Sequence, residues 1–226
     1  MPLPSLFSGP PPDRSTFVEP HAIPFSPQQW LNRLPEPWMI GALADVQPTG
    51  GNRWPEVDRQ TLIAAGSRVT TREEAVRFYV MACAWGVGVN QRFVTRRVRV
   101  LTDNDDPGAR LLAGIRLNQQ EGPTTAYASF RDGGANRLKH LGPGFFTKIL
   151  YFSGWTTSPG PRPLILDQYV ANALNDIANL GWRPTWNWTT AQYEQYLGLA
   201  TGWADEWGTQ PDVIEKTLFR HGQRRD

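Results

Sequence analysis

Two glycines flanking a proline, Gly142-Pro143-Gly144, constrain the fold of this chain more than any other short segment. Glycine tolerates backbone conformations closed to other residues and lets another surface approach closely, whereas proline fixes its own φ and has no N–H group. An apolar run begins at Phe145, so we expect a tight turn and then a helix that starts abruptly. We expect the segment leading into the turn from Leu138 to be helical as well.

The start of this second helix predicts an anion-binding site. Its first N–H groups have no partner within the helix, and they point in the same direction as the positive end of the helix dipole. Because no strand precedes the turn, we interpret the anion as a nucleic-acid phosphate. The residues expected to contact it are Lys139, His140, Gly142, Gly144, Thr147 and Lys148.

A carboxylate, Asp167, follows the apolar run Pro163–Leu166 and precedes a helical stripe that begins near Val170. One interpretation is an N-cap, in which the Asp167 side chain accepts hydrogen bonds from the first turn of the helix. The other is a partly buried catalytic carboxylate. The two interpretations are compatible, because a capping aspartate is held rigidly and is kept ionised by the helix N-terminus.

The motif Leu141-Gly142-Pro143-Gly144-Phe145-Phe146-Thr147, followed by Asp167-Gln168-Tyr169-Val170, resembles the helix-hairpin-helix DNA glycosylases, in particular bacterial members with an 8-oxoguanine or alkylated-base glycosylase-like fold. Residues 142–170 carry the specific part of the resemblance and residues 70–226 a looser part; the first 60 residues carry none. The resemblance implies an all-α helix-hairpin-helix domain over residues 61–226. It also implies that the partner is double-stranded DNA with a flipped base.

The chemistry implied by this resemblance is removal of a damaged or modified base. Cleavage of the N-glycosidic bond builds positive charge on the sugar while the base leaves. A carboxylate near C1′ stabilises that charge and activates a water molecule. We expect Asp167 to be this group.

One position departs from the bifunctional members of the family, which carry a Schiff-base lysine two residues after the second glycine. Phe146 stands there in this chain. Lys148 lies two residues further on, a turn of about 200° around a helix, so we expect it not to reach the same pocket. The resemblance therefore implies a monofunctional enzyme without AP-lyase activity. Phe146 takes the position that lines the base pocket; Phe145 and Trp155 are further candidates, with core packing as the alternative.

Four arginines within eight residues, Arg92, Arg96, Arg97 and Arg99, concentrate positive charge and predict a phosphate-facing surface. The loop before them contains Asn90 and Gln91. By the resemblance, Asn90, Gln91 and Arg92 would fill the space left by the flipped base. The alternative is a solvated connector.

Composition narrows the class of protein. One cysteine among 226 residues excludes a disulfide framework and a cysteine-ligated cluster within the chain, and three histidines do not suggest a zinc site. We therefore expect no cofactor and no metal. No apolar run is long enough to span a membrane and the N-terminus has no apolar signal core, so we expect a soluble, cytoplasmic monomer.

The net charge of only +2 argues weakly for nucleic acid and keeps two alternatives open. The first is a non-catalytic protein of the glycosylase fold that binds nucleic acid or a protein partner bearing a nucleobase-like group, with a role in antiphage defence. The second is a helical scaffold whose tryptophans serve only the core.

Residues 1–60 form a second expected unit, a proline-rich extension with one short helix that Ser26 and Pro27 start. We expect Phe7, Phe17 and Phe25 to anchor the extension on the domain, with partial disorder as the alternative. Residues 36–60 are expected to be irregular, and no segment has a convincing strand pattern. Trp182, Trp186 and Trp188 are expected in a loop, and Arg220, His221, Arg224 and Arg225 in a solvated basic tail.

Overall fold

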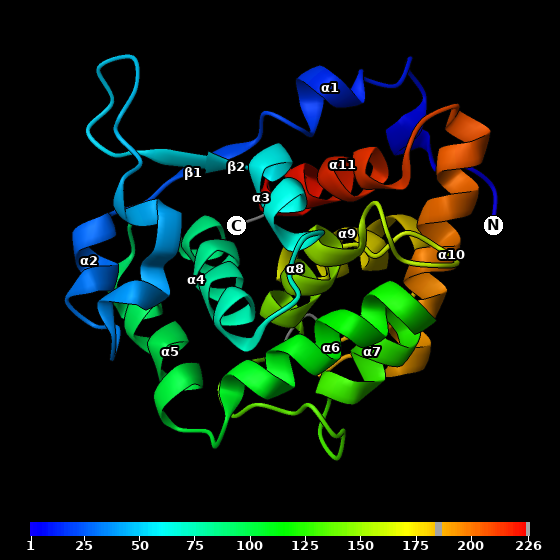
Figure 1. The fold of residues 1–226 in the computed structure, drawn as a ribbon. Helices are drawn as coiled ribbons and strands as arrows, with labels where there is room; N and C mark the ends of the chain where they lie inside the picture. Colours follow the sequence, from blue (N-terminus) through cyan, green and yellow to red (C-terminus); the bar gives the residue numbers. More distant parts are fainter. Residues whose placement is uncertain (184–186, 225–226) are drawn as a thin grey trace.

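The computed structural model describes residues 1–183 and 187–224, and it consists almost entirely of helices (Figure 1). The all-α prediction is confirmed. Trp186 and Arg225 lie outside the described residues. The α-helices are α1 Arg14–Phe17, α2 Pro27–Leu31, α3 Arg59–Gly66, α4 Arg72–Val87, α5 Gln91–Thr102, α6 Pro107–Glu121, α7 Pro123–Phe130, α8 Pro143–Gly154, α9 Gln168–Ala178, α10 Thr190–Trp207 and α11 Pro211–Gln223; the 3-10 helices are η1 Ser5–Phe7 and η2 Pro37–Ala44.

A small strand pair lies in the part of the chain that was expected to lack strands. Strand β1 (Ala22–Pro24) runs antiparallel to β2 (Glu56–Asp58), with Ile23 opposite Val57. Three residues are too few for an alternating pattern to be recognised in the sequence. The expectation that residues 36–60 are irregular is also wrong, because η2, β2 and the first two residues of α3 lie there.

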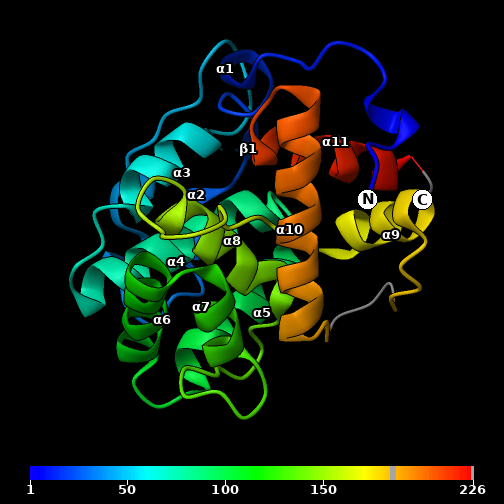
Figure 2. The ribbon, with the colours of Figure 1, turned by 90° about the vertical axis from the view of Figure 1, so that its right-hand side faces the viewer.

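Helix α8 forms the centre of the molecule (Figures 1 and 2). It packs against α3, α4, α6 and α7, and its residues from Phe146 to Gly154 are all buried. A helix that is apolar on nearly every side is stable only when other elements bury it on those sides. At the closest approach, a Cβ atom placed on Gly66 of α3 would lie 2.6 Å from the carbonyl oxygen of Phe152, so only glycine fits there.

The start of α4 follows from local sequence. The Thr71 hydroxyl accepts a hydrogen bond from the Glu74 N–H, and the Glu74 carboxylate accepts one from the Thr71 N–H. This reciprocal pair satisfies two N–H groups that the helix itself leaves free. The apolar segment from Ala75 to Trp85 lies within α4, and both of these residues are buried.

The N-terminal segment lies over the C-terminal helix α11, where Figure 1 shows blue chain beside red. Phe7 and Phe25 are buried as expected, whereas Phe17 is only half-buried, beneath the cations of Lys216 and Arg220. The proline-rich segment is thus in contact with helices from the opposite end of the chain.

Candidate active site at the hairpin

The turn before α8 differs from the prediction in one respect. No helix leads into it, because α7 ends at Phe130 and the chain then makes turns as far as Gly142. Neither Gly142 nor Gly144 has a positive φ; the left-handed residue is His140, with φ of 69°. The ring of His140 lies 2.9 Å from the Asp103 carboxylate, which links this backbone conformation to the end of α5. Glycine is therefore not required here for the conformation of the turn.

Gly142 is extended and caps α8, and Pro143 is its first residue. The N–H group of Gly144, in the first turn, has no partner within the helix. This is the predicted abrupt start, with backbone donors facing away from the helix.

Asp167 caps the next helix, α9, and lies against the first turn of α8. Its carboxylate accepts hydrogen bonds from the N–H groups of Tyr169 (3.1 Å) and Val170 (3.2 Å), and its side chain remains 18% exposed. A Cβ atom placed on Gly144 would lie 3.7 Å from the Cβ of Asp167. The structure thus brings the predicted carboxylate to the predicted turn.

Lys148, which the sequence predicts not to reach the pocket position of Phe146, lines neither hairpin cavity and extends towards Asp167. Its Nζ lies 3.6 Å from Oδ2 of Asp167 and donates to the carbonyl oxygen of Gly144 at 2.6 Å, and the side chain is only 8% exposed. Lys148 lies four residues after Gly144, against which Asp167 lies, and residues four apart share one face of a helix. Lys148 is therefore on the face of α8 that Asp167 approaches.

Thr147 lies beneath this pair, not on the surface. It is fully buried, and its hydroxyl donates to the Pro143 carbonyl (2.6 Å) and accepts from the Leu166 N–H (3.1 Å). This placement speaks against the expected contact with phosphate. The hydroxyl instead fixes the extended segment that leads into Asp167.

The three aromatic residues expected to line a base pocket lie in different places. Phe146 is 1% exposed and packs on Tyr127 and Phe130, facing away from Asp167. Phe145 is half-buried, with the Arg97 guanidinium carbon 4.0 Å and the Lys148 Nζ 5.2 Å from its ring centre. Trp155 follows the last turn of α8, packs on Tyr151 and lines neither hairpin cavity.

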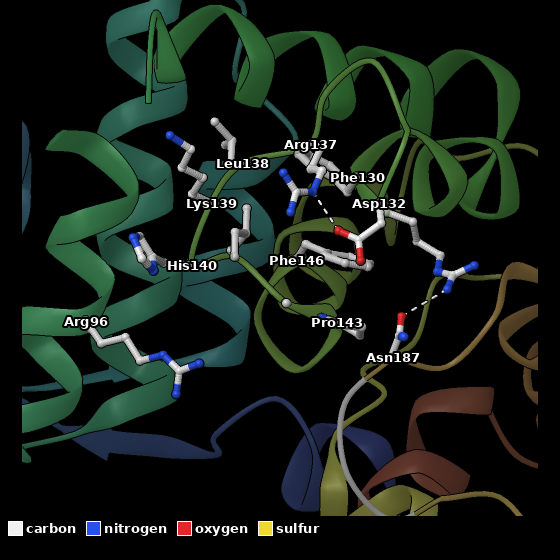
Figure 3. A pocket seen from close by; sticks show the side chains of 13 residues that line it. Arg96, Phe130, Asp132, Arg137, Leu138, Lys139, His140, Pro143, Phe146 and Asn187 are labelled. Atoms are coloured by element: carbon white, nitrogen blue, oxygen red, sulfur yellow. Dashed lines mark hydrogen bonds and ion pairs between the residues drawn. The ribbon is translucent and has the colours of Figure 1, made fainter. Parts of the chain in front are cut away.

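Two cavities flank the hairpin and share Arg96, His140, Gly142 and Pro143. The first, of about 250 Å³, is drawn in Figure 3, where Arg96 and His140 lie to the left of Phe146 and the Arg137–Asp132 pair lies above it. Lys139 lines it too. Five of its lining residues are basic: Arg96, Arg131, Arg137, Lys139 and His140.

The second cavity, of about 290 Å³, lies on the side of Asp167. It is lined by Gly144, Phe145, Gln168, Arg96 and Arg97, among others. Asp167 does not line it, but its neighbours Gly144 and Gln168 do. This cavity is therefore a space beside the Asp167–Lys148 pair that a ligand could enter.

The residues expected to fill the space left by a flipped base lie at the start of α5. Asn90 caps this helix by accepting from the Arg92 N–H at 3.2 Å, and Asn90, Gln91 and Arg92 are all exposed. They line neither hairpin cavity. The next residue, Phe93, is 51% exposed.

The arginine cluster divides into exposed and buried members. Arg92, Arg96 and Arg99 are exposed, whereas Arg97 is only 4% exposed. The sequence contains a signal for this: Arg97 lies three residues after Val94 and directly before Val98, within the apolar stripe of an amphipathic helix.

The single cysteine, Cys83, is buried on α4, and burial raises the pKa of its thiol to about 11. A protonated, buried thiol is a poor nucleophile. Among residues 1–183 and 187–224 there is no group of three or more His, Cys, Asp or Glu residues placed to hold a metal ion. In the same part of the chain, no helix is both long and apolar enough to cross a membrane.

The sequence pattern of one protein family, described as "Putative 8-oxoguanine DNA glycosylase OGG-like protein", matches residues 16–219. The match begins within the N-terminal segment, so most of the first 60 residues belong to the family pattern although they carried no part of the resemblance noted above. No curated protein and no solved structure matches the chain. Because the match spans most of the 226 residues and includes the hairpin and Asp167, the chain belongs to the OGG-like family of 8-oxoguanine DNA glycosylase-like proteins.

Proposed function

We propose that this protein is a DNA N-glycosylase of the helix-hairpin-helix type that hydrolyses the N-glycosidic bond of a damaged or modified base. The observation that carries the proposal is the contact of Asp167 with the glycine-flanked start of α8, beside a cavity lined by arginines. The family match supports the same class of reaction.

Asp167 is suited to stabilise an oxocarbenium ion. Two backbone N–H groups of α9 hold the carboxylate, while 18% of the side chain remains accessible. In the reaction, the bond from C1′ to the base nitrogen breaks and its electron pair leaves with the base. The carboxylate then faces the positive charge on the sugar, directs water to C1′ and accepts the proton of that water.

The hairpin would hold the DNA backbone through the amides of Gly142 and Gly144 and through Lys139 and His140. These groups line the two cavities, as far as the structure describes them. Such contacts position a strand without reading its sequence. Asn90, Gln91 and Arg92 remain proposed contacts to the duplex around the flipped base, at the exposed start of α5.

Lys148 favours a second candidate chemistry. An amine 3.6 Å from the catalytic carboxylate could attack C1′ in place of water. The sugar would then form an imine with Nζ, and β-elimination would cleave the strand, which is AP-lyase activity. The hydrogen bond from Nζ to Gly144 and the burial of the side chain favour hydrolysis, because a nucleophile must be free and accessible.

Replacing the carboxylate tests the main proposal. We expect Asp167→Asn to lower the rate of base release by about 10²- to 10⁴-fold, the range for loss of a positioned acid–base group. The fold should persist, because asparagine is also a good N-cap. The measurement is mass spectrometry of the free bases released from oxidised, alkylated and phage-derived duplex DNA.

A matched control is Asp105→Asn, which makes the same charge change at an exposed position. Its rate should equal that of the unmodified protein. Sodium borohydride added during the reaction separates the two chemistries, since it traps an imine between Lys148 and DNA but does not trap a hydrolytic intermediate. Binding of duplex DNA without release of any base from this panel would leave the non-catalytic alternative.

A further inference from the structure

A buried cation without a partner lines the cavity beside the candidate active site. Arg97 is only 4% exposed, and none of the described residues accepts a hydrogen bond from its guanidinium; its Nε is fully buried. Buried charged groups are almost always paired, and an unpaired one in a folded protein calls for an explanation. A ligand that the protein binds during function is such an explanation.

The surroundings of Arg97 hold it in place without neutralising it. The Tyr79 hydroxyl donates to the Arg97 backbone carbonyl at 2.7 Å, and the guanidinium stacks on Phe145 at 4.0 Å from the ring centre. A cation on an aromatic face gains some energy but no hydrogen bonds. The N–H groups of the Arg97 guanidinium are therefore held in place and donate no hydrogen bond to any described residue.

The cavity that Arg97 lines is suited to an anion. Arg96 adds a second guanidinium, and the first turn of α8 contributes the Gly144 N–H, which has no partner within its helix. Among the described residues that line it there is no aspartate or glutamate. The planar fork of arginine matches two oxygens of one phosphate group.

We propose that Arg97 binds a phosphodiester group of the DNA strand beside Asp167, gripping it together with the first turn of α8. The inference rests on the proposed glycosylase function, and it assigns to α5 a positioning residue that acts on the backbone, not on the base. Placing one phosphate in this cavity sets the distance between the neighbouring sugar and the Asp167 carboxylate.

The test uses Arg97→Met in the full chain, with Asp167→Asn in every protein so that the DNA stays intact. Methionine keeps an apolar side chain of similar length on Phe145. We expect the slope of log binding constant against log salt concentration to become shallower by about 0.9. At physiological salt, affinity for duplex DNA should fall about tenfold or more.

The control is Arg72→Met, which removes the same charge from an arginine whose side chain is 64% exposed and lines neither hairpin cavity. Its salt slope should not change. Arg97→Lys should keep part of the affinity, because the charge remains while the fork is lost. If methionine at position 97 prevents folding, the lysine variant still tests the proposal: it keeps the charge and therefore the salt slope, so an unchanged affinity for duplex DNA would overturn the proposal.

Thermal unfolding distinguishes phosphate binding by Arg97 from a role of Arg97 in stabilising the core. Because Arg97 is buried and unpaired without DNA, Arg97→Met should raise the melting temperature or leave it unchanged. A large decrease together with a normal salt slope would mean that Arg97 serves the core, and would overturn the proposal. Stabilisation by inorganic phosphate that Arg97→Met abolishes, without any effect on DNA binding, would assign the cavity to a small anion and overturn it as well.

The two proposals fail in different ways. Base release by the unmodified protein, with a salt slope unaffected by Arg97→Met, would leave the glycosylase assignment intact and remove the role of Arg97. DNA binding that depends on Arg97, without base release, would support the phosphate contact and remove the enzymatic assignment.

Discussion

At the scale of single residues, Thr147 shows how the candidate site is held together. Its hydroxyl joins the carbonyl of Pro143 to the N–H of Leu166, so it links the first turn of α8 to the segment that carries Asp167. Both bonds are buried. The position of the carboxylate relative to the hairpin therefore depends on one buried side chain that is bonded to the backbone on both sides.

We expect Thr147→Val to lower the free energy of unfolding by about 1–3 kcal/mol, because the Leu166 N–H would remain buried without a partner. Valine matches threonine in shape, so the lost free energy of unfolding comes from the missing hydroxyl group and not from a cavity. Urea unfolding measures the effect. Thr147→Ser, which retains the hydroxyl, should recover the hydrogen-bond contribution, and a valine variant as stable as the original protein would contradict this account.

At the scale of elements, the molecule is organised by the close packing of other helices around α8. The approach of α3 to α8 is limited by backbone atoms, since a Cβ on Gly66 would lie 2.6 Å from the Phe152 oxygen and 2.7 Å from Cζ of Phe78. A backbone carbonyl within a helix cannot move aside as a flexible side chain can. The two helices can lie this close together because residue 66 has only a hydrogen atom in place of a side chain.

Gly66→Ala should destabilise the protein by about 1–3 kcal/mol, because the extra methyl group forces α3 away from α8. Gly198→Ala on α10 is the matched control. Position 198 is exposed and a Cβ atom there meets nothing within 4 Å, so alanine should stabilise the helix by about 0.5–1 kcal/mol. Equal effects of the two substitutions in thermal unfolding would argue against a tight contact at Gly66.

At the scale of the whole molecule, buried charges tie the N-terminal segment to α11. Arg14 pairs with the fully buried Asp212 at 2.9 Å, and Arg59 pairs with Glu215 at 2.6 Å. Burial raises the pKa of Glu215, although Arg59 opposes this effect. Breaking such a pair leaves an uncompensated charge in the core, so the two ends of the chain are expected to unfold together.

His21 makes this junction sensitive to acid. Burial, followed by the charges of Arg59, Lys216 and Arg220, lowers the pKa of its ring from 6.5 to about 3. Between these values the unfolded chain binds a proton that the folded protein does not, so stability falls as pH decreases from about 6.5 towards 3. The slope from one such proton is at most about 1.4 kcal/mol per pH unit.

We expect His21→Phe to remove this part of the pH dependence. Phenylalanine keeps an aromatic ring against Trp85, on which the His21 ring packs edge-on at 5.2 Å. Urea unfolding at pH 7.5, 6, 5 and 4 should give a shallower loss of stability for the variant, with the difference largest at pH 4. Parallel curves for the two proteins would show that His21 does not carry the effect.

The sequence alone was sufficient for the features that arise from neighbouring residues. Helix starts at Ser26 and Asp167 were predicted because a cap forms hydrogen bonds within three residues of itself. The turn at Gly142-Pro143-Gly144 and the helix after it were predicted because proline fixes its own φ and an apolar run follows. These signals identified an all-α chain, and the family resemblance joined Asp167 and the turn into one candidate site.

Only the tertiary structure decided which helix faces meet. Lys148 lies beside Asp167, which the rotation along α8 alone does not predict, because the contact is set by where α9 begins against Gly144. Arg97 looked like one more surface arginine and is buried, and Trp155 is placed at the opposite end of α8 from the hairpin. Periodicity along one helix fixes the angles between its side chains, but not the direction from which its neighbours approach, since that depends on how the whole core packs.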